Sequence, residues 1–136
     1  MHEVKTEWTG GMSFDSTVAG HHVKLDAADE FGGSNKGPTP KPLLLTALTG
    51  CTGMDVVSLL KKMRIEYEGF SMTVQADVAE EHPKVYTSIH LIYEFTGRDL
   101  PLDKLKKAVE LSQERYCSVS AMLSKACKMT YELKTV

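Results

Sequence analysis

The sequence has few cysteines, no excess of one charge and no long apolar run without polar interruptions. Three cysteines are an odd and sparse set, which argues against a secreted disulfide framework. The 16 Lys and Arg residues against 18 Asp and Glu residues leave a net charge of −2, which rules out a strongly basic nucleic-acid surface. The most apolar stretch, 43–60, is interrupted by Thr46, Thr49, Asp55 and Ser58, so no membrane span is expected.

What the sequence does contain is typical of one globular domain. A chain of 136 residues with 42 % hydrophobic residues can support its own core, so we predict a single domain over residues 1–136. The first residues show no basic segment leading into an apolar one, so no secretory signal is expected. These features favour a cytoplasmic protein with neither nucleic acid nor a membrane as its partner.

Alternating polar and apolar residues in the first quarter predict three short strands, at 3–8, 12–18 and 22–26. The first of these is expected to be half-buried. Residues 29–42 follow, rich in glycine and proline, and predict a flexible loop of unusual length.

The rest of the chain predicts an α+β fold. Its expected elements are a long helix over 42–64, an antiparallel hairpin of strands over 70–78 and 85–95, a helix over 102–116, and a last strand over 127–134. We expect an antiparallel sheet packed against the long, buried central helix. That helix is apolar nearly all round and needs cover on every side. We therefore predict an intertwined homodimer, with a monomer that covers the helix by itself as the alternative.

Cys51 and Cys117 are the candidate reactive residues. Cys51 lies inside the long helix between Gly50 and Gly53, beyond the first turn, so its activation needs a separate cation or hydrogen-bond donor. Asp55 shares its helix face and would be costly to bury unless paired. Cys117 lies where two helical segments meet, and a helix N-terminus lowers a thiol pKa. The alternative for both is an inert buried cysteine.

The third cysteine and the histidines give weaker indications of a functional site. Cys127 has the parity of the last strand's apolar residues, so it is interpreted as a core residue. The five histidines are scattered, and no Cys/His spacing matches a zinc site, so no metal and no bound cofactor are expected.

Two motifs together resemble the OsmC/Ohr family, most closely its small OsmC-like branch. They are the stretch 37–57, which contains Gly-Pro-Thr-Pro-Lys-Pro and later Thr-Gly-Cys-Thr-Gly-Met-Asp, and the stretch Tyr-Cys-Ser-Val over 116–119. The order of expected elements fits the family over essentially the whole chain. The resemblance implies an intertwined homodimer with active sites at the subunit interface.

The resemblance also implies thiol-dependent reduction of organic hydroperoxides in oxidative or osmotic stress protection. Cys51 would attack the peroxide, Cys117 would resolve the sulfenic acid as a disulfide, and an external dithiol would restore both thiols. Active members of the family carry an Arg after the first glycine turn and a Glu just before the long helix. Here Met12 stands at the first position and Lys41 or Pro42 at the second.

The residues hypothesised to replace that missing pair are Glu30, Asp55 and Arg115. Two further functions stay open at this point. One is a dimeric module that binds a small apolar or electrophilic molecule without turnover. The other is a structural dimer with inert cysteines.

Overall fold

Three antiparallel strands form the first part of the chain, in the order β1 (Val4–Gly10), β2 (Ser13–Val18) and β3 (His21–Leu25). They lie close to the three strands that the alternation predicts. Gly11 and Gly20, in the two connecting turns, have φ values of 54° and 82°, a conformation that glycine adopts without penalty. The expectation of a half-buried first strand is wrong, because β1 is exposed on both faces and Trp8 is 67 % exposed.

The glycine- and proline-rich loop over 29–42 was expected to be flexible, but hydrogen bonds to one carboxylate hold its first part in place. The buried carboxylate of Asp26 accepts hydrogen bonds from the backbone N–H groups of Ala27, Ser34 and Lys36, at 2.7, 3.3 and 3.1 Å. These bonds, that of Ala27 first, lower the pKa of Asp26. A short 3-10 turn, Asp29–Phe31, occupies the start of the loop.

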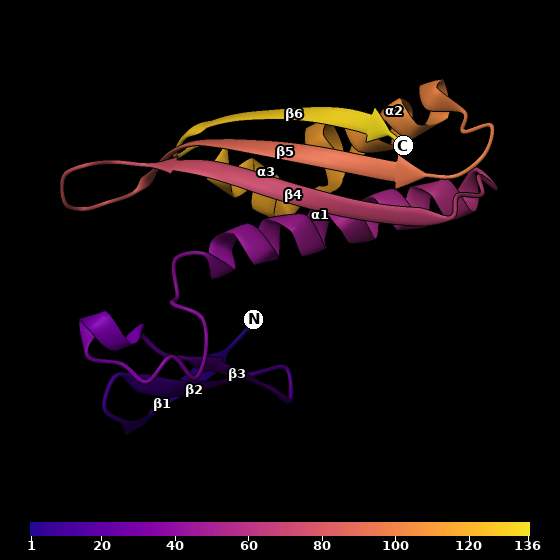
Figure 1. Ribbon diagram of the computed structural model, residues 1–136. Helices are drawn as coiled ribbons and strands as arrows, with labels where there is room; N and C mark the ends of the chain where they lie inside the picture. The colour runs from indigo at the N-terminus through magenta and orange to yellow at the C-terminus, as the bar shows by residue number, and fades with distance from the viewer. The chain divides into compact units, whose positions relative to one another are not determined.

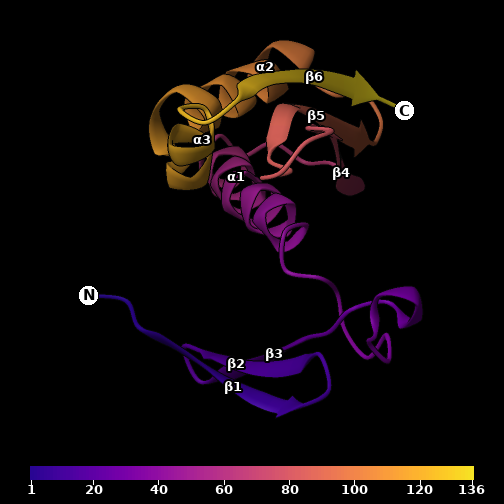
Figure 2. The same ribbon diagram turned by 90° about the vertical axis from the view of Figure 1, so that its left-hand side faces the viewer.

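The computed structural model describes residues 1–136 and divides into two compact units, Met1–Thr46 and Ala47–Val136. The single domain over residues 1–136 stays a prediction. The second unit contains most of helix α1 (Leu43–Lys62), strands β4 (Gly69–Val78) and β5 (Tyr86–Thr96), helices α2 (Leu102–Leu111) and α3 (Ser118–Leu123), and strand β6 (Lys128–Thr135). All three helices lie on the same face of the sheet that β4, β5 and β6 form (Figures 1 and 2).

The second sheet is mixed, which corrects the expectation of a single antiparallel sheet. Strands β4 and β5 pair antiparallel, with Phe70 opposite Phe95 and Val74 opposite Leu91. Strand β6 pairs parallel to β5, with Ile89 opposite Met129. The physical reason is the connection: the chain leaves β5 at its C-terminal end, runs back along the sheet through the helices, and re-enters at the end where β5 begins, as a parallel pair requires.

The core of the second unit lies between the sheet and the helices. Alternate residues of β5 face the helices and are fully buried, as are the inner faces of α1 and α2. The core comprises Ile89, Leu91, Tyr93, Phe95, Leu48, Val56, Leu60, Leu105, Ala108 and Val109. Each large apolar side chain buried in this way contributes about 1.5–3 kcal/mol.

Helix α1 is buried on one face only, so this chain does not cover the helix by itself, and the homodimer predicted to cover the other face stays a prediction. Leu44, Val57 and Met54 are exposed, the last by 76 % of its surface. By length and composition α1 could cross a membrane. The core helix of a soluble protein passes the same test, so a single such helix is weak support for a membrane span.

Candidate functional site

Cys51 lies on α1 and contacts the first turn of α3. Its Sγ is 3.9 Å from Ser118 Oγ, and its side chain is partly exposed. Neither flanking glycine lies at this contact, because Gly53 faces strand β4 and a Cβ at Gly50 would meet nothing within 4 Å. A Cβ at Gly53 would lie 2.5 Å from the Met72 methyl group on β4, so this position fits glycine.

Cys117 caps the N-terminus of α3 and is 97 % buried, with 3 % of its surface exposed. The predicted helix over 102–116 does not run straight into it. Helix α2 ends at Leu111, and a π-helical turn over Ser112–Tyr116 follows. In this wider turn the Cys117 N–H donates to Ser112 O at 2.8 Å. The extra residue swings Cys117 toward α1, and such π-turns are frequent at functional sites.

The two sulfur atoms and the Asp55 carboxylate converge. One ligand atom from each of Cys51, Asp55 and Cys117 lies within 4.8 Å of the other two. Both thiols are free in this structure. A disulfide needs its sulfur atoms about 2.05 Å apart, so rotation of the cysteine side chains has to close the remaining gap.

The two thiols have opposite pKa shifts. Burial raises the pKa of Cys51. Hydrogen bonds from the Val119 backbone N–H, the Cys117 thiol and the Ser118 hydroxyl outweigh that effect and leave the pKa below its usual value. For Cys117 burial dominates, and the hydrogen bond to Cys51 acts in the same direction, so its pKa is raised. The favoured arrangement is a Cys51 thiolate that accepts a hydrogen bond from the Cys117 thiol.

This result corrects one part of the sequence interpretation. The N-terminus of α3 was expected to activate Cys117, but two of its donors, the Val119 N–H and the Ser118 hydroxyl, act on Cys51. The Ser120 N–H donates to the Cys117 Sγ at 3.4 Å, too little to offset burial. The sequence did indicate that Cys51 needs a separate donor, but it gave no sign that Ser118 and Val119 supply it.

Asp55 is paired, as its burial requires, and it does not activate Cys51. Ser112 Oγ donates to Asp55 Oδ2 at 3.0 Å. The negative charge of Asp55 raises the pKa of Cys51, opposite to the effect hypothesised for a replacement of the family's missing residues. Asp55 therefore does not lower the pKa of Cys51, and any role that it has at the site is a different one.

A buried network of hydroxyl groups supports this side of the site. Thr52 Oγ1 lies 2.6 Å from Tyr93 OH and 2.7 Å from Ser112 Oγ. Gln113 Nε2 donates to Tyr93 OH at 2.6 Å. The network joins α1, β5 and the π-turn, so it fixes how α1 faces the segment that carries Cys117. None of these four residues was singled out from the sequence.

The remaining hypothesised residues are Arg115, in the second unit, and Glu30, in the first. The Arg115 guanidinium is 5.4 Å from the centre of the Tyr116 ring, in a cation–π contact on the surface. Glu30 is exposed on the 3-10 turn of the first unit, where Met12, Lys41 and Pro42 also lie. Cys127 is half-buried just before β6, and its Sγ donates to Leu123 O at 3.7 Å.

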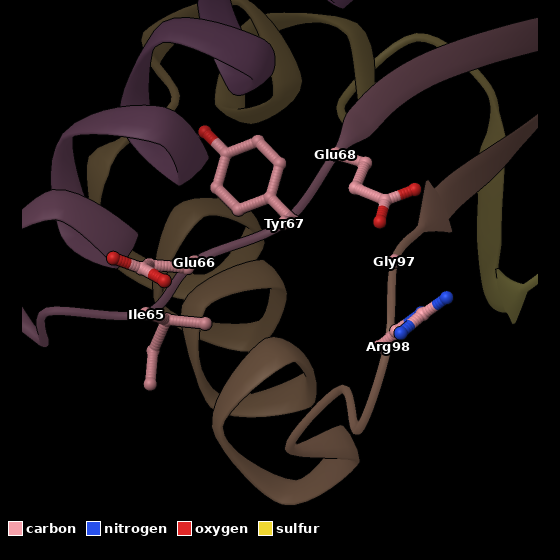
Figure 3. A pocket seen from close by; sticks show the side chains of 6 residues that line it. All are labelled: Ile65, Glu66, Tyr67, Glu68, Gly97 and Arg98. Carbon is pink, nitrogen blue, oxygen red and sulfur yellow. The ribbon is translucent and has the colours of Figure 1, made fainter.

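The cavities of the second unit include two that neither cysteine lines. One, of about 540 Å³, follows the exposed face of α1 and is lined mainly by apolar groups of Gly50, Gly53, Met54, Val57 and Met72. The other, of about 450 Å³, lies between the segment after α1 and the end of β5 (Figure 3). Glu66 lies on one side of Tyr67 there, and Glu68 and Arg98 lie on the other.

Comparisons with known proteins define the class. The family model described as OsmC-like protein matches residues 33–132, and the chain belongs to this family. Protein YhfA of Escherichia coli K12 is 34 % identical over 135 residues, which cover 98 % of each chain. A crystal structure described as a hypothetical protein from Aquifex aeolicus VF5 is 32 % identical, with a TM-score of 0.84 over 100 % of this chain and 98 % of that one.

A more distant structure shows the fold alone. The organic hydroperoxide resistance protein OhrB of Bacillus subtilis is 18 % identical, with a TM-score of 0.64 over 98 % of this chain and 97 % of that one. The mixed α+β arrangement is therefore an OsmC-like fold, as the two sequence motifs indicated.

Proposed function

We propose that this protein reduces organic hydroperoxides with Cys51 as the peroxidatic residue and Cys117 as the resolving residue. The observation that carries the proposal is the placement of the two sulfur atoms within 4.8 Å, although the residues are far apart in sequence. One thiol is partly exposed and the other buried, which matches an attacking and a resolving role.

The reaction runs in two steps on the protein. The Cys51 thiolate attacks one peroxide oxygen and the O–O bond breaks; the leaving alkoxide takes up a proton and departs as an alcohol, and Cys51 becomes a sulfenic acid. The Cys117 sulfur then attacks the Cys51 sulfur, water leaves, and a disulfide forms. An external dithiol returns both residues to thiols by disulfide exchange.

The surroundings of Cys51 support attack by a thiolate. Three hydrogen-bond donors already point at its sulfur, so little rearrangement is needed to stabilise the negative charge. These donors stabilise the Cys51 thiolate as the family's Arg would, but without a positive charge. Names of relatives in the family, such as the organic hydroperoxide resistance protein OhrB, support the choice of substrate class.

A homodimer and a cytoplasmic location belong to the same proposal. Met54, Val57 and Leu44 leave an apolar face of α1 uncovered in one chain, and a second copy would cover it. A reducing cytoplasm keeps the three thiols free between turnovers.

The experiment titrates the reduced protein with cumene hydroperoxide and counts free thiols by mass spectrometry. Rapid loss of two thiols per chain is expected, together with a peptide that joins Cys51 to Cys117. Cys127→Ser is the matched control and should lose the same two thiols. Thiols that survive an excess of peroxide would overturn the proposal.

A binding module without turnover is the second candidate, favoured by the apolar cavity along α1. It predicts unchanged thiols in the same titration and saturable binding of a small apolar molecule. The Gly50→Val substitution would fill that cavity, since a Cβ at Gly50 meets nothing within 4 Å. A peroxidase confined to the cysteine pair would keep its activity in this variant.

A further inference from the structure

Cys51, Asp55 and Cys117 also form a set of metal ligands. Two thiols and one carboxylate, from three positions in the sequence, offer one ligand atom each within 4.8 Å of the others. The sequence predicts no metal site, because these three residues do not have the short local spacings of known zinc motifs. Here α1 supplies two ligands one turn apart, and the cap of α3 supplies the third.

We propose that the reduced protein binds one zinc ion at Cys51, Cys117 and Asp55. Two thiolates select a thiophilic divalent cation over magnesium or calcium, and zinc accepts carboxylate oxygen as well. Three protein ligands leave the fourth tetrahedral position for water. The inference rests on the reduced thiols and their geometry, and it is independent of the proposed peroxide chemistry.

The distances fit a tetrahedral zinc ion. With zinc–sulfur bonds of about 2.3 Å, two ligating sulfur atoms lie about 3.8 Å apart, which is inside the observed limit. Cys51 and Asp55 lie four residues apart on α1 and share a face of the helix. Cys51 is partly exposed, and a cavity of about 160 Å³ borders Asp55, so an ion can reach the site.

The groups behind the ligands hold them in place. Ser112 donates to Asp55 Oδ2 and leaves the second carboxylate oxygen for the metal. Ser112 is in turn held by Thr52, which also contacts Tyr93. Outer hydrogen bonds of this kind orient the ligands of metal sites.

Zinc binding and disulfide formation exclude each other. Binding uses the Cys51 thiolate and displaces the proton of the Cys117 thiol, so about one proton is released at a pH where Cys51 is ionised. A disulfide has no thiolate left to offer. Zinc therefore protects both thiols from oxidation and alkylation, and oxidation releases the ion.

The experiment titrates fully reduced protein, without oxygen, with zinc in competition with a chromophoric chelator, and with cadmium followed by its thiolate charge-transfer absorption. One ion per chain is expected. Asp55→Asn should lower the zinc affinity by more than about 100-fold, because loss of an outer partner alone lowers it 10–100-fold. Ser112→Ala should fall within that smaller range. Cys127→Ser is the matched control and should bind as the unaltered chain does.

X-ray absorption at the zinc edge provides a direct check, with two sulfur ligands and the rest oxygen or nitrogen expected. No sulfur ligand, or equal affinity in Cys51→Ser, would overturn the proposal. Unaltered affinity in Asp55→Asn would overturn the three-ligand set. If a variant fails to fold, alkylation of Cys51 in the unaltered protein repeats the test, and it should abolish binding.

The two proposals can fail separately. A protein that binds zinc but leaves cumene hydroperoxide intact would overturn the peroxidase and keep the metal site. A protein that consumes peroxide at the same rate with and without excess zinc would overturn the metal site alone.

Discussion

Cys51 and Cys117 share one site but sit in contrasting surroundings. Cys51 lies in the middle of a long helix, partly exposed, and receives hydrogen bonds from three donors on a neighbouring segment. Cys117 begins a short helix, yet it is buried and donates to its neighbour. The cysteine with the favourable position in its own helix has the raised pKa, and the other has the lowered one.

The difference shows that a helix N-terminus activates the group its free N–H groups reach, which need not be its own cap residue. The N–H of Val119 is directed at Cys51 on another helix. The Ser120 N–H reaches Cys117, but burial outweighs it. The two thiols therefore differ in pKa although N–H groups of the same helical turn reach both of them.

Removal of either cysteine is the strongest test of the different roles assigned to Cys51 and Cys117. Cys51→Ser should abolish the reaction with cumene hydroperoxide. Cys117→Ser should still consume one equivalent and then stop, because the sulfenic acid has no resolving thiol. Mass spectrometry after trapping with dimedone checks this: an adduct is expected on Cys51 in Cys117→Ser only. An adduct on Cys117 in Cys51→Ser would reverse the assignment of roles.

The pH dependence of alkylation compares the two thiols in one sample. A lowered pKa means that the Cys51 thiolate persists to lower pH, and a raised pKa means that Cys117 ionises only above the ordinary thiol range. At pH 7, iodoacetamide should modify Cys51 at least about 10-fold faster than Cys117, because an ordinary thiol is only a few per cent ionised there. A chelator in the buffer removes competing zinc.

Peptide mapping over a pH series measures both rates. The Cys51 profile should have its midpoint below that of Cys117. Equal midpoints for Cys51 and Cys117 would remove the basis for the contrast.

Much of the fold could be predicted from the sequence, because periodicity and turn residues report local structure. The predicted helix over 42–64 is α1 within about two residues, and the antiparallel hairpin is β4 with β5. The parallel pairing of β6 could not be predicted, because strand direction depends on the path of the chain through the helices. The apolar pattern of α1 did indicate that the helix needs cover beyond one chain, but it does not show what supplies that cover.

The site could be predicted only in part. Cys51 and Cys117 were found because two motifs resemble a family, and Asp55 because it shares a helix face with Cys51. The donors Ser118 and Val119 were missed, since the π-turn at Ser112–Tyr116 that brings them to Cys51 leaves no signature in an amphipathic helix pattern. Arg115 was favoured as a nearby cation, but sequence proximity does not fix where a side chain points.

The buried network tests whether the contrast depends on how α1 faces the π-turn. Thr52→Val should destabilise the protein by about 1–3 kcal/mol, because Tyr93 and Ser112 each lose a buried hydrogen-bond partner. Thr52→Ser keeps the hydroxyl and should lose about 1 kcal/mol for the missing methyl group. Denaturant unfolding gives both values. Equal losses in the two variants would show that packing, and not the network, holds these elements together.

The smallest expected effect separates the donors themselves. Ser118→Ala removes one of three hydrogen bonds to the Cys51 thiolate, a loss of about 1 kcal/mol that should raise the Cys51 pKa. Ser124→Ala is the matched control at the other end of α3. Its exposed hydroxyl donates to Ala121 O and not to either cysteine, so its removal should leave the Cys51 pKa unaltered. The pH profile of Cys51 alkylation measures the pKa in both variants. If Ser118→Ala behaves like Ser124→Ala, the backbone N–H of Val119 and the Cys117 thiol alone account for the lowered pKa. The difference in pKa between Cys51 and Cys117 would then arise from the backbone of α3 and the contact between the two sulfur atoms, without a contribution from the Ser118 hydroxyl.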